Sequence, residues 1–141
     1  MTLYRLVEIL KDIALRQPLV RTTGEGNIYE LMNANPKINY GVFFATQQTH
    51  TQDEGFDHYN FVLFYIDRLV SDLDDNRLQV QSIGKEILTN IIRTIEDEYD
   101  VDVSTISYTT FTQKFADECA GCYVTLTFDI PLDYLCEEQY E

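Results

Sequence analysis

Hydrophobic residues at the start of the chain repeat at the spacing of a helix. Between Met1 and Gln17 the apolar side chains recur every three or four positions, which places them on one helical face. Thr2 has a side chain suited to an N-cap, and Pro18 disfavours helical dihedrals at the residue before it. The pattern predicts an amphipathic first helix. Its apolar face comprises Leu3, Leu6, Val7, Leu10, Ile13 and Ala14.

Two strands are predicted after a stretch of mixed character. Residues 21–39 combine Gly, Asn and Pro with a few apolar residues, which is typical of a strand or turn followed by a loop. Tyr40–His50 and His58–Asp67 then carry apolar side chains on both faces, which indicates a hairpin covered on both sides. We expect the chain's own helices to cover one face and a neighbouring subunit to cover the other.

The segment that joins these strands, Gln47 to Asp57, is almost entirely polar. A polar tip on a long hairpin is expected to project beyond the body of the domain, here over residues 47–58. A plain solvated loop is the alternative interpretation of the same residues.

The second half of the chain repeats the order of helix and hairpin. An apolar stripe predicts a helix from about Asp75 to Tyr99, and the stretch Val103–Gln113 is typical of a strand. Apolar residues alternate strictly from Cys122 to Ile130, and a C-terminal extension follows over residues 131–141. The whole chain, residues 1–141, is therefore predicted to be one α+β domain. It has a mostly antiparallel sheet of two long hairpins packed against two helices.

Charge changes the picture of the surface. The 141 residues include 24 Asp and Glu but 10 Lys and Arg, so the formal net charge is −14. Such a surface repels phosphates and anionic membranes, which argues against nucleic acid reading and membrane binding. An acidic wall would let a DNA duplex slide past without sticking. The alternative is that the charge merely keeps the protein soluble. No signal peptide or membrane span is predicted, and the three cysteines fit a reducing cytoplasm.

Cys119 and Cys122 form a CxxC motif, which raises the question of a metal or redox site. A structural zinc site needs four ligands, and the additional thiol, Cys136, does not complete one. Redox motifs of this spacing begin a helix, whereas a strand follows here. We interpret both residues as ordinary turn and core cysteines.

Asp72, Asp74 and Asn76 have the spacing of the first three ligands of a calcium-binding loop. Such a loop continues with Gly at its sixth position and Glu at its twelfth, where this chain has Arg77 and Ile83. An acidic cap at the start of the second helix is the better interpretation.

His50 and His58 flank Asp53, Glu54 and Asp57, a set that would suit a divalent ion if the tip had a fixed register. A solvated polar loop is the simpler interpretation. The sequence lacks a GxSxG motif, a Gly-rich phosphate loop and an HExxH motif. We predict neither an enzyme nor a cofactor.

Two segments carry a resemblance to a known family. The first runs from Gly26 through Pro36 to Phe44, and the second from Phe111 through Gly121 to Cys136. Together with the middle helix they resemble small virion proteins of phages from Bacteroides-type hosts, including the crAss-like phages. The resemblance spans roughly residues 26 to 136.

This resemblance implies a tail-terminator-like ring subunit of the head-tail connector, neck or tail. It further implies partners among copies of the same chain and the portal, neck or tail tube proteins. DNA would pass through the ring without sequence-specific binding, and the protein would assemble in the host bacterial cytoplasm into the virion. The alternative function is an acidic soluble module that recognises a basic protein partner. The residues expected at subunit interfaces are Gln47, Gln48, His50, Asp53, Glu54, Asp57, His58, Leu132, Tyr134, Leu135 and Cys136.

Overall fold

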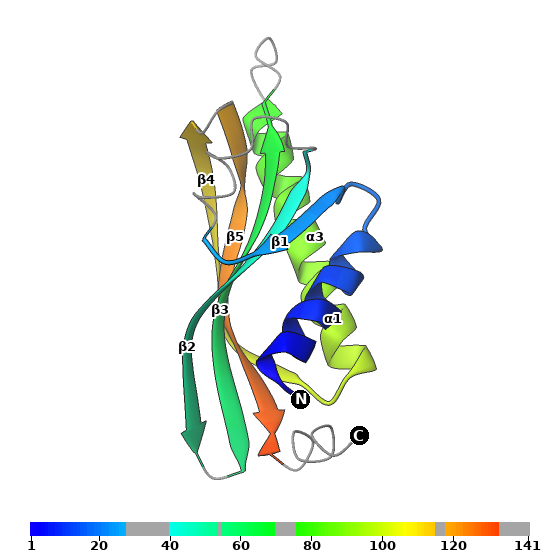
Figure 1. Ribbon diagram of the computed structural model, residues 1–141. Coiled ribbons are helices and arrows are strands. Elements are labelled where there is room, and N and C mark those ends of the chain that lie inside the picture. The colour runs from blue at the N-terminus through cyan, green and yellow to red at the C-terminus, as the bar shows by residue number, and fades with distance from the viewer. Residues whose placement is uncertain (28–39, 54, 70–75, 115–117, 133–141) are drawn as a thin grey trace.

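The described chain folds into a five-stranded sheet with two helices on one of its faces (Figure 1). The computed structural model describes residues 1–27, 40–53, 55–69, 76–114 and 118–132, with the backbone alone for residues 113, 114 and 118. Its elements, in chain order, are α1 (Leu3–Leu15), β1 (Thr22–Glu25), β2 (Val42–Asp53), β3 (Phe56–Arg68), α3 (Asn76–Glu98), β4 (Asp102–Lys114) and β5 (Glu118–Pro131).

The sheet has the strand order β1-β2-β3-β5-β4. β1 runs parallel to β2, and the other three pairs are antiparallel. The two predicted hairpins, β2–β3 and β4–β5, therefore lie side by side through β3 and β5. This confirms the predicted α+β fold with two long hairpins packed on two helices. β1 lies in the stretch that was expected to hold a strand or turn, and its parallel pairing with β2 makes the sheet mixed.

Both predicted helices are confirmed. The Thr2 side chain caps α1 by accepting a hydrogen bond from the Arg5 backbone N–H at 3.1 Å. The helix ends at Leu15, before Pro18. The Arg16 guanidinium lies 2.8 Å from the Glu98 carboxylate, which joins the C-terminal ends of α1 and α3.

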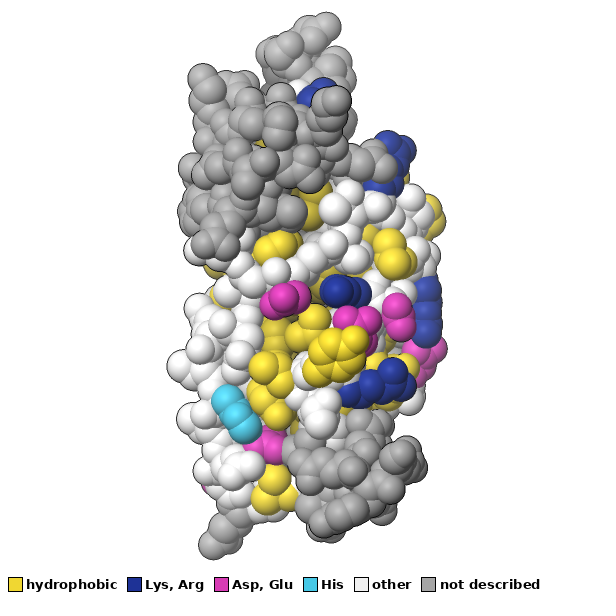
Figure 2. Space-filling model, in the orientation of Figure 1, with side chains coloured by type: hydrophobic (Ala, Val, Ile, Leu, Met, Phe, Trp, Pro, Cys, Tyr) yellow, Lys and Arg dark blue, Asp and Glu magenta, His cyan; other side chains and the backbone are white. Residues whose placement is uncertain are grey.

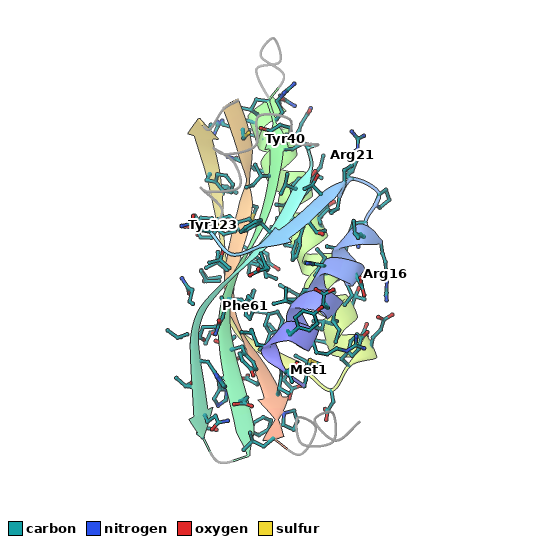
Figure 3. All side chains as sticks on the ribbon, in the orientation of Figure 1. Met1, Arg16, Arg21, Tyr40, Phe61 and Tyr123 are labelled. Carbon is teal, nitrogen blue, oxygen red and sulfur yellow. The ribbon has the colours of Figure 1, made fainter. Side chains whose placement is uncertain are left out.

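The main core lies between the sheet and the two helices. Buried residues of α1 and α3 pack there against alternate residues of β2, β3 and β5. Phe61, labelled in Figure 3, belongs to this layer and packs edge-on against Phe128, with ring centroids 5.6 Å apart. The predicted alternation in the last strand is confirmed, because all five of its apolar positions are buried. These positions are Cys122, Val124, Leu126, Phe128 and Ile130.

A smaller apolar cluster lies on the opposite face of the sheet, which we call the open face because it is turned away from α1 and α3. It contains Val42, Phe44, Ile66 and Cys119. Each of the first three side chains is at most 2% exposed in the single chain. The doubly apolar hairpin is thus confirmed. One copy already buries these residues, so this cluster does not by itself require the neighbouring subunit that we expected to cover it.

The polar segment that joins the first two predicted strands is not the solvated loop of the alternative interpretation. β2 continues to Asp53 and β3 begins at Phe56, so most of residues 47–58 are paired strand. Thr51 pairs with His58, and Gln52 pairs with Asp57. Figure 1 shows this paired end reaching beyond α1 and α3. Its polarity fits a position past the layer formed by α1 and α3.

Both long outer strands are irregular at the same level of the sheet. The register of β2 shifts between Gln47 and His50, and that of β4 shifts between Ser104 and Ser107. Thr105, in the β4 irregularity, has a positive φ of 53°. Bulges of this kind increase the local twist of a sheet and alter the direction of the strand. The two irregularities separate the apolar part of the open face, around Phe44 and Ile66, from its polar part, around His58 and Asn60.

Candidate functional site on the polar half of the sheet

The paired end of the β2–β3 hairpin distributes its charged side chains over two faces. Strand alternation puts Asp57 and Tyr59 on the helix side, and His58 and Asn60 on the open face. The predicted site residues therefore do not converge on one point. They form two separate groups, which are centred on His58 and Asp57.

A row of polar side chains crosses four strands of the open face at His58. One ring nitrogen of His58 (Nε2) lies 2.9 Å from the Asp53 carboxylate of β2. The other ring nitrogen (Nδ1) contacts the Asp129 carboxylate of β5. The Ser104 hydroxyl of β4 donates to the second oxygen of Asp129 at 2.8 Å. The row thus ties both hairpins together through side chains as well as through the backbone ladder.

The surroundings of His58 favour its protonated form. Hydrogen bonds to the Asp129 carboxylate and then to the Asp53 carboxylate raise the pKa of His58 above its ordinary value. Asp102 also pairs with Asp129 across β4 and β5. A neutral His58 would leave three carboxylates on this part of the sheet without a compensating charge.

A second polar row lies one step nearer the middle of the sheet. Asn60 donates from its side-chain amide to the Thr49 hydroxyl and accepts from the Thr127 hydroxyl at 2.6 Å. The hydroxyl of Thr127 also lies 2.8 Å from that of Thr105. This row crosses the two irregular strands, and a hollow of about 500 Å³ opens beside it. The residues that line it are uncharged and mostly polar, and Gln48, Thr125 and Leu126 complete the wall.

The second group lies on the helix side of the sheet. Asp57 is 1% exposed, and its carboxylate lies 2.6 Å from Nε2 of His50. The His50 ring stacks on Tyr59, with centroids 4.3 Å apart. A buried carboxylate needs such a hydrogen-bonding partner, because desolvation without one is costly. This group is better explained as a structural element of the hairpin than as a reactive site.

Cys119 and Cys122 lie on opposite faces of β5. Cys119 belongs to the cluster on the open face, whereas Cys122 belongs to the main core. Burial raises the pKa of the Cys122 thiol, which makes it a poorer nucleophile. Two side chains on opposite faces of one strand cannot hold one metal ion, so the interpretation of both as ordinary buried cysteines is supported.

The remaining predicted residues divide between surface, core and undescribed positions. Gln47 and Gln48 are exposed on β2. Leu132 is half-buried against the main core, and its N–H donates to the Gly55 carbonyl at 3.0 Å. Asn76 is the first residue of α3. The other predicted positions lie outside the described residues, namely Glu54, Asp72, Asp74, Tyr134, Leu135 and Cys136.

Sequence reasoning missed the β4 and β5 members of both rows. Ser104, Thr127 and Asp129 stand in strands that pattern analysis treated as ordinary, and Asp129 is 71 positions from His58. A usable signal was the run of polar residues on the outward side of the last strand. Turning it into contacts required the register between the two hairpins.

Comparisons with known proteins add no family. The sequence matches no protein-family model and no curated protein. Among the described residues, no group of three or more His, Cys, Asp or Glu side chains is arranged to hold a metal ion. None of the described helices has the length and apolar character needed to cross a membrane.

Proposed function

We propose that this chain is a non-enzymatic structural subunit of a bacteriophage neck or tail, which assembles with copies of itself into a ring around the DNA channel of the virion. The resemblance of residues 26 to 136 to small phage virion proteins suggests this role. The charge and shape of the described chain give it physical support.

The observation that carries the proposal is the braced, polar end of the β2–β3 hairpin. It extends past the helices (Figure 1), and every described residue of β2 from Gln47 to Asp53 is exposed. Two side-chain rows fix this end to β5 and β4. A projecting arm that is held rigid loses little conformational entropy when it docks on a neighbour. Such an arm suits assembly better than catalysis.

The net charge supports a position beside DNA. A formal charge of −14 repels phosphate groups, so a ring of such subunits would not retain a passing duplex. Rings arise from heterologous contacts, in which one surface of a subunit meets a different surface of the next. An acidic module that binds a basic partner protein is the second candidate, because the same charge would attract such a partner.

Two measurements test the proposal. Native mass spectrometry of the purified chain is expected to show a closed oligomer, and quantitative proteomics of purified phage is expected to show a constant number of copies per particle. A chain that stays monomeric and is missing from purified particles would contradict the proposal and favour the binding module.

A pair of matched variants tests the role of the hairpin arm. Gln48→Lys with Gln52→Lys adds two positive charges to exposed residues of β2. Gln79→Lys with Ser82→Lys adds the same charge to exposed residues of α3. The first variant is expected to lose incorporation into particles, and the second is expected to retain it. Equal incorporation of both variants would remove the arm from the assembly surface.

A further inference from the structure

The two outer edges of the sheet are unlike each other. On one side, β4 forms an edge of 13 residues next to β5. On the other side, β1 covers β2 only as far as Ala45. The Gly26 N–H donates to the Ala45 carbonyl at 3.0 Å, and the chain then leaves β2 at Gly26, whose φ is +111°. No described strand lies beside β2 from Gln47 to Asp53.

From these edges we propose that β4 of one copy adds to the edge of β2 that no described strand covers in the next copy, so that the sheet continues from subunit to subunit. This inference rests on the proposed self-assembly and names the surfaces that carry it. Strand addition to an exposed edge is an established mode of protein recognition. Here every copy of the chain carries both edges, so each copy can donate β4 to one neighbour and accept a strand at β2 from another.

Strand direction agrees with this pairing. Because neighbouring strands from β2 to β4 are all antiparallel, β2 and β5 run one way, and β3 and β4 run the other. When β4 of one copy is placed beside β2 of the next copy in a continuous sheet, the two strands are antiparallel. The new pair therefore has the same hydrogen-bond pattern as three of the four existing pairs.

An apolar groove lies beside the acceptor edge. The groove holds about 400 Å³ between α1 and the sheet, with Leu3, Tyr4 and Val7 on one wall and Ala45 and Phe61 on the other. Figure 2 shows hydrophobic side chains gathered over α1 and the adjoining part of the sheet, with charged side chains around them. A strand added to β2 would place alternate side chains into this groove.

The donor edge offers an apolar side chain on the matching side. Ile106 lies in the irregular part of β4 and is 44% exposed. Tyr108 contacts Thr89 of α3, so alternation places Ile106 on the helix side of the sheet as well. In a continuous sheet this is the side on which the next copy has its groove. Ile106 therefore fits the groove in chemistry and in direction.

The net charges beside the two edges are of opposite sign. Lys85 of α3 lies over the Tyr108 ring, 5.6 Å from its centroid, and it shares an exposed side of α3 with Arg93 and with one acidic residue, Glu86. Glu8 and Glu25 line the acceptor groove, where Lys11 is 3.4 Å from Glu8. Docking of β4 on β2 would bring the basic side of α3 toward these carboxylates. The irregularities in both edges confine regular pairing to short segments and thus discourage indiscriminate edge-to-edge aggregation.

Two variants remove one edge each. Ile106→Lys places a charge on the donor edge and leaves β2 unchanged. Gln47→Pro removes a backbone N–H from the acceptor edge. The Ala45 carbonyl points away from β3, and Gln47 is two residues further on, so its N–H also points outward. Leu78→Lys is the matched control, since Leu78 is an exposed apolar residue of α3, 56% exposed, and lines neither the acceptor groove nor the side of α3 that carries Lys85 and Arg93.

Native mass spectrometry of separate and mixed proteins provides the test. The wild type and Leu78→Lys are expected to form the same oligomer, and each edge variant alone is expected to be monomeric. An equimolar mixture of Ile106→Lys and Gln47→Pro is expected to give a dimer with one copy of each, because one intact donor edge meets one intact acceptor edge. The dimer does not grow further, because the two edges that remain free in it are the altered ones.

The outcomes separate this inference from the proposed function. If the edge variants assemble like the wild type, the ring stands and the edge pairing is wrong. If Gln47→Pro assembles alone while Ile106→Lys does not, β4 pairs with itself and the head-to-tail arrangement is wrong. A wild type that is monomeric at high concentration contradicts both. Circular dichroism checks folding, and Tyr4→Arg, at a groove residue 76% exposed, replaces Gln47→Pro if the proline variant is unfolded.

Discussion

At the scale of single residues, the fold controls the ionisation of His58 through two carboxylates. Its two ring nitrogens both contact carboxylates, and these contacts raise its pKa. A histidine with a raised pKa in the folded state stabilises the fold fully below its unfolded pKa, near 6.5. This contribution disappears as the pH rises through the folded pKa.

We therefore predict that the free energy of unfolding falls between pH 6 and pH 9 by up to about 1 kcal/mol, because the site is partly open to solvent. Urea denaturation at a series of pH values measures the fall. His58→Gln is expected to reduce this fall. An unchanged pH dependence in the variant would show that the His58 row does not contribute to stability.

Gly121 gives a second prediction at this scale. A Cβ added at this position would lie 1.9 Å from the Tyr65 carbonyl oxygen, so β3 and β5 would have to move apart. Overpacking of this kind typically costs about 1–3 kcal/mol, and we expect Gly121→Ala to lose at least that much stability. Thr125→Ala, on the same strand and face, is the control and is expected to lose less. Urea denaturation of the three proteins gives the comparison, and equal losses would contradict the close approach of the strands.

The residue scale also shows what a sequence pattern can and cannot locate. Proximity along the chain suggested that His50, Asp53, Asp57 and His58 share one hairpin end, and the structure has all four in the paired end of β2 and β3. The pattern did not show that Asp57 and His58 point to opposite faces, because a polar stretch gives no apolar alternation from which to read the faces. It also did not show that Asp129 joins His58, since that contact depends on register between distant strands.

At the scale of elements, α1 depends on its cap. The Arg5 N–H would lose its side-chain acceptor in Thr2→Ala, and loss of an N-cap typically costs about 1 kcal/mol. Thr2→Ser retains a hydroxyl and is expected to stay close to the wild type. Urea denaturation measures both differences. If the alanine and serine variants lose the same free energy, the hydroxyl does not cap the helix.

Element prediction succeeded wherever burial imposed a period. The apolar stripe of α3 and the alternation from Cys122 to Ile130 follow directly from contact with the main core. Element prediction failed for Gln47–Asp53, because this part of β2 is a strand that has no apolar face. Backbone pairing with β3 holds this segment extended. A polar strand and a polar loop have similar sequences when neither side packs against a helix.

At the scale of the whole molecule, the distribution of polarity argues for assembly through edges rather than through the sheet faces. A single copy buries most apolar residues of the β2–β3 hairpin on both sides, with Phe64 partly buried, so an unburied apolar face is a weak reason to expect a ring. The uncovered edges, the polar arm and the exposed Ile106 remain as surfaces that a second copy can use. The sequence suggested a partner, and the fold changes the reason for expecting one.

Net charge gives a prediction that belongs to the whole molecule. The 24 acidic residues outnumber the 10 basic ones, and the resulting repulsion disfavours the compact state. Salt screens charges on the surface, so raising NaCl from low to moderate concentration is expected to raise the melting temperature by a few degrees. The variant Glu96→Gln with Asp97→Asn removes two negative charges from exposed residues of α3. Its melting temperature is expected to rise less with salt. Differential scanning calorimetry at several NaCl concentrations makes the comparison. A melting temperature independent of salt would mean that opposite charges already offset the repulsion locally, as Glu98 does with Arg16.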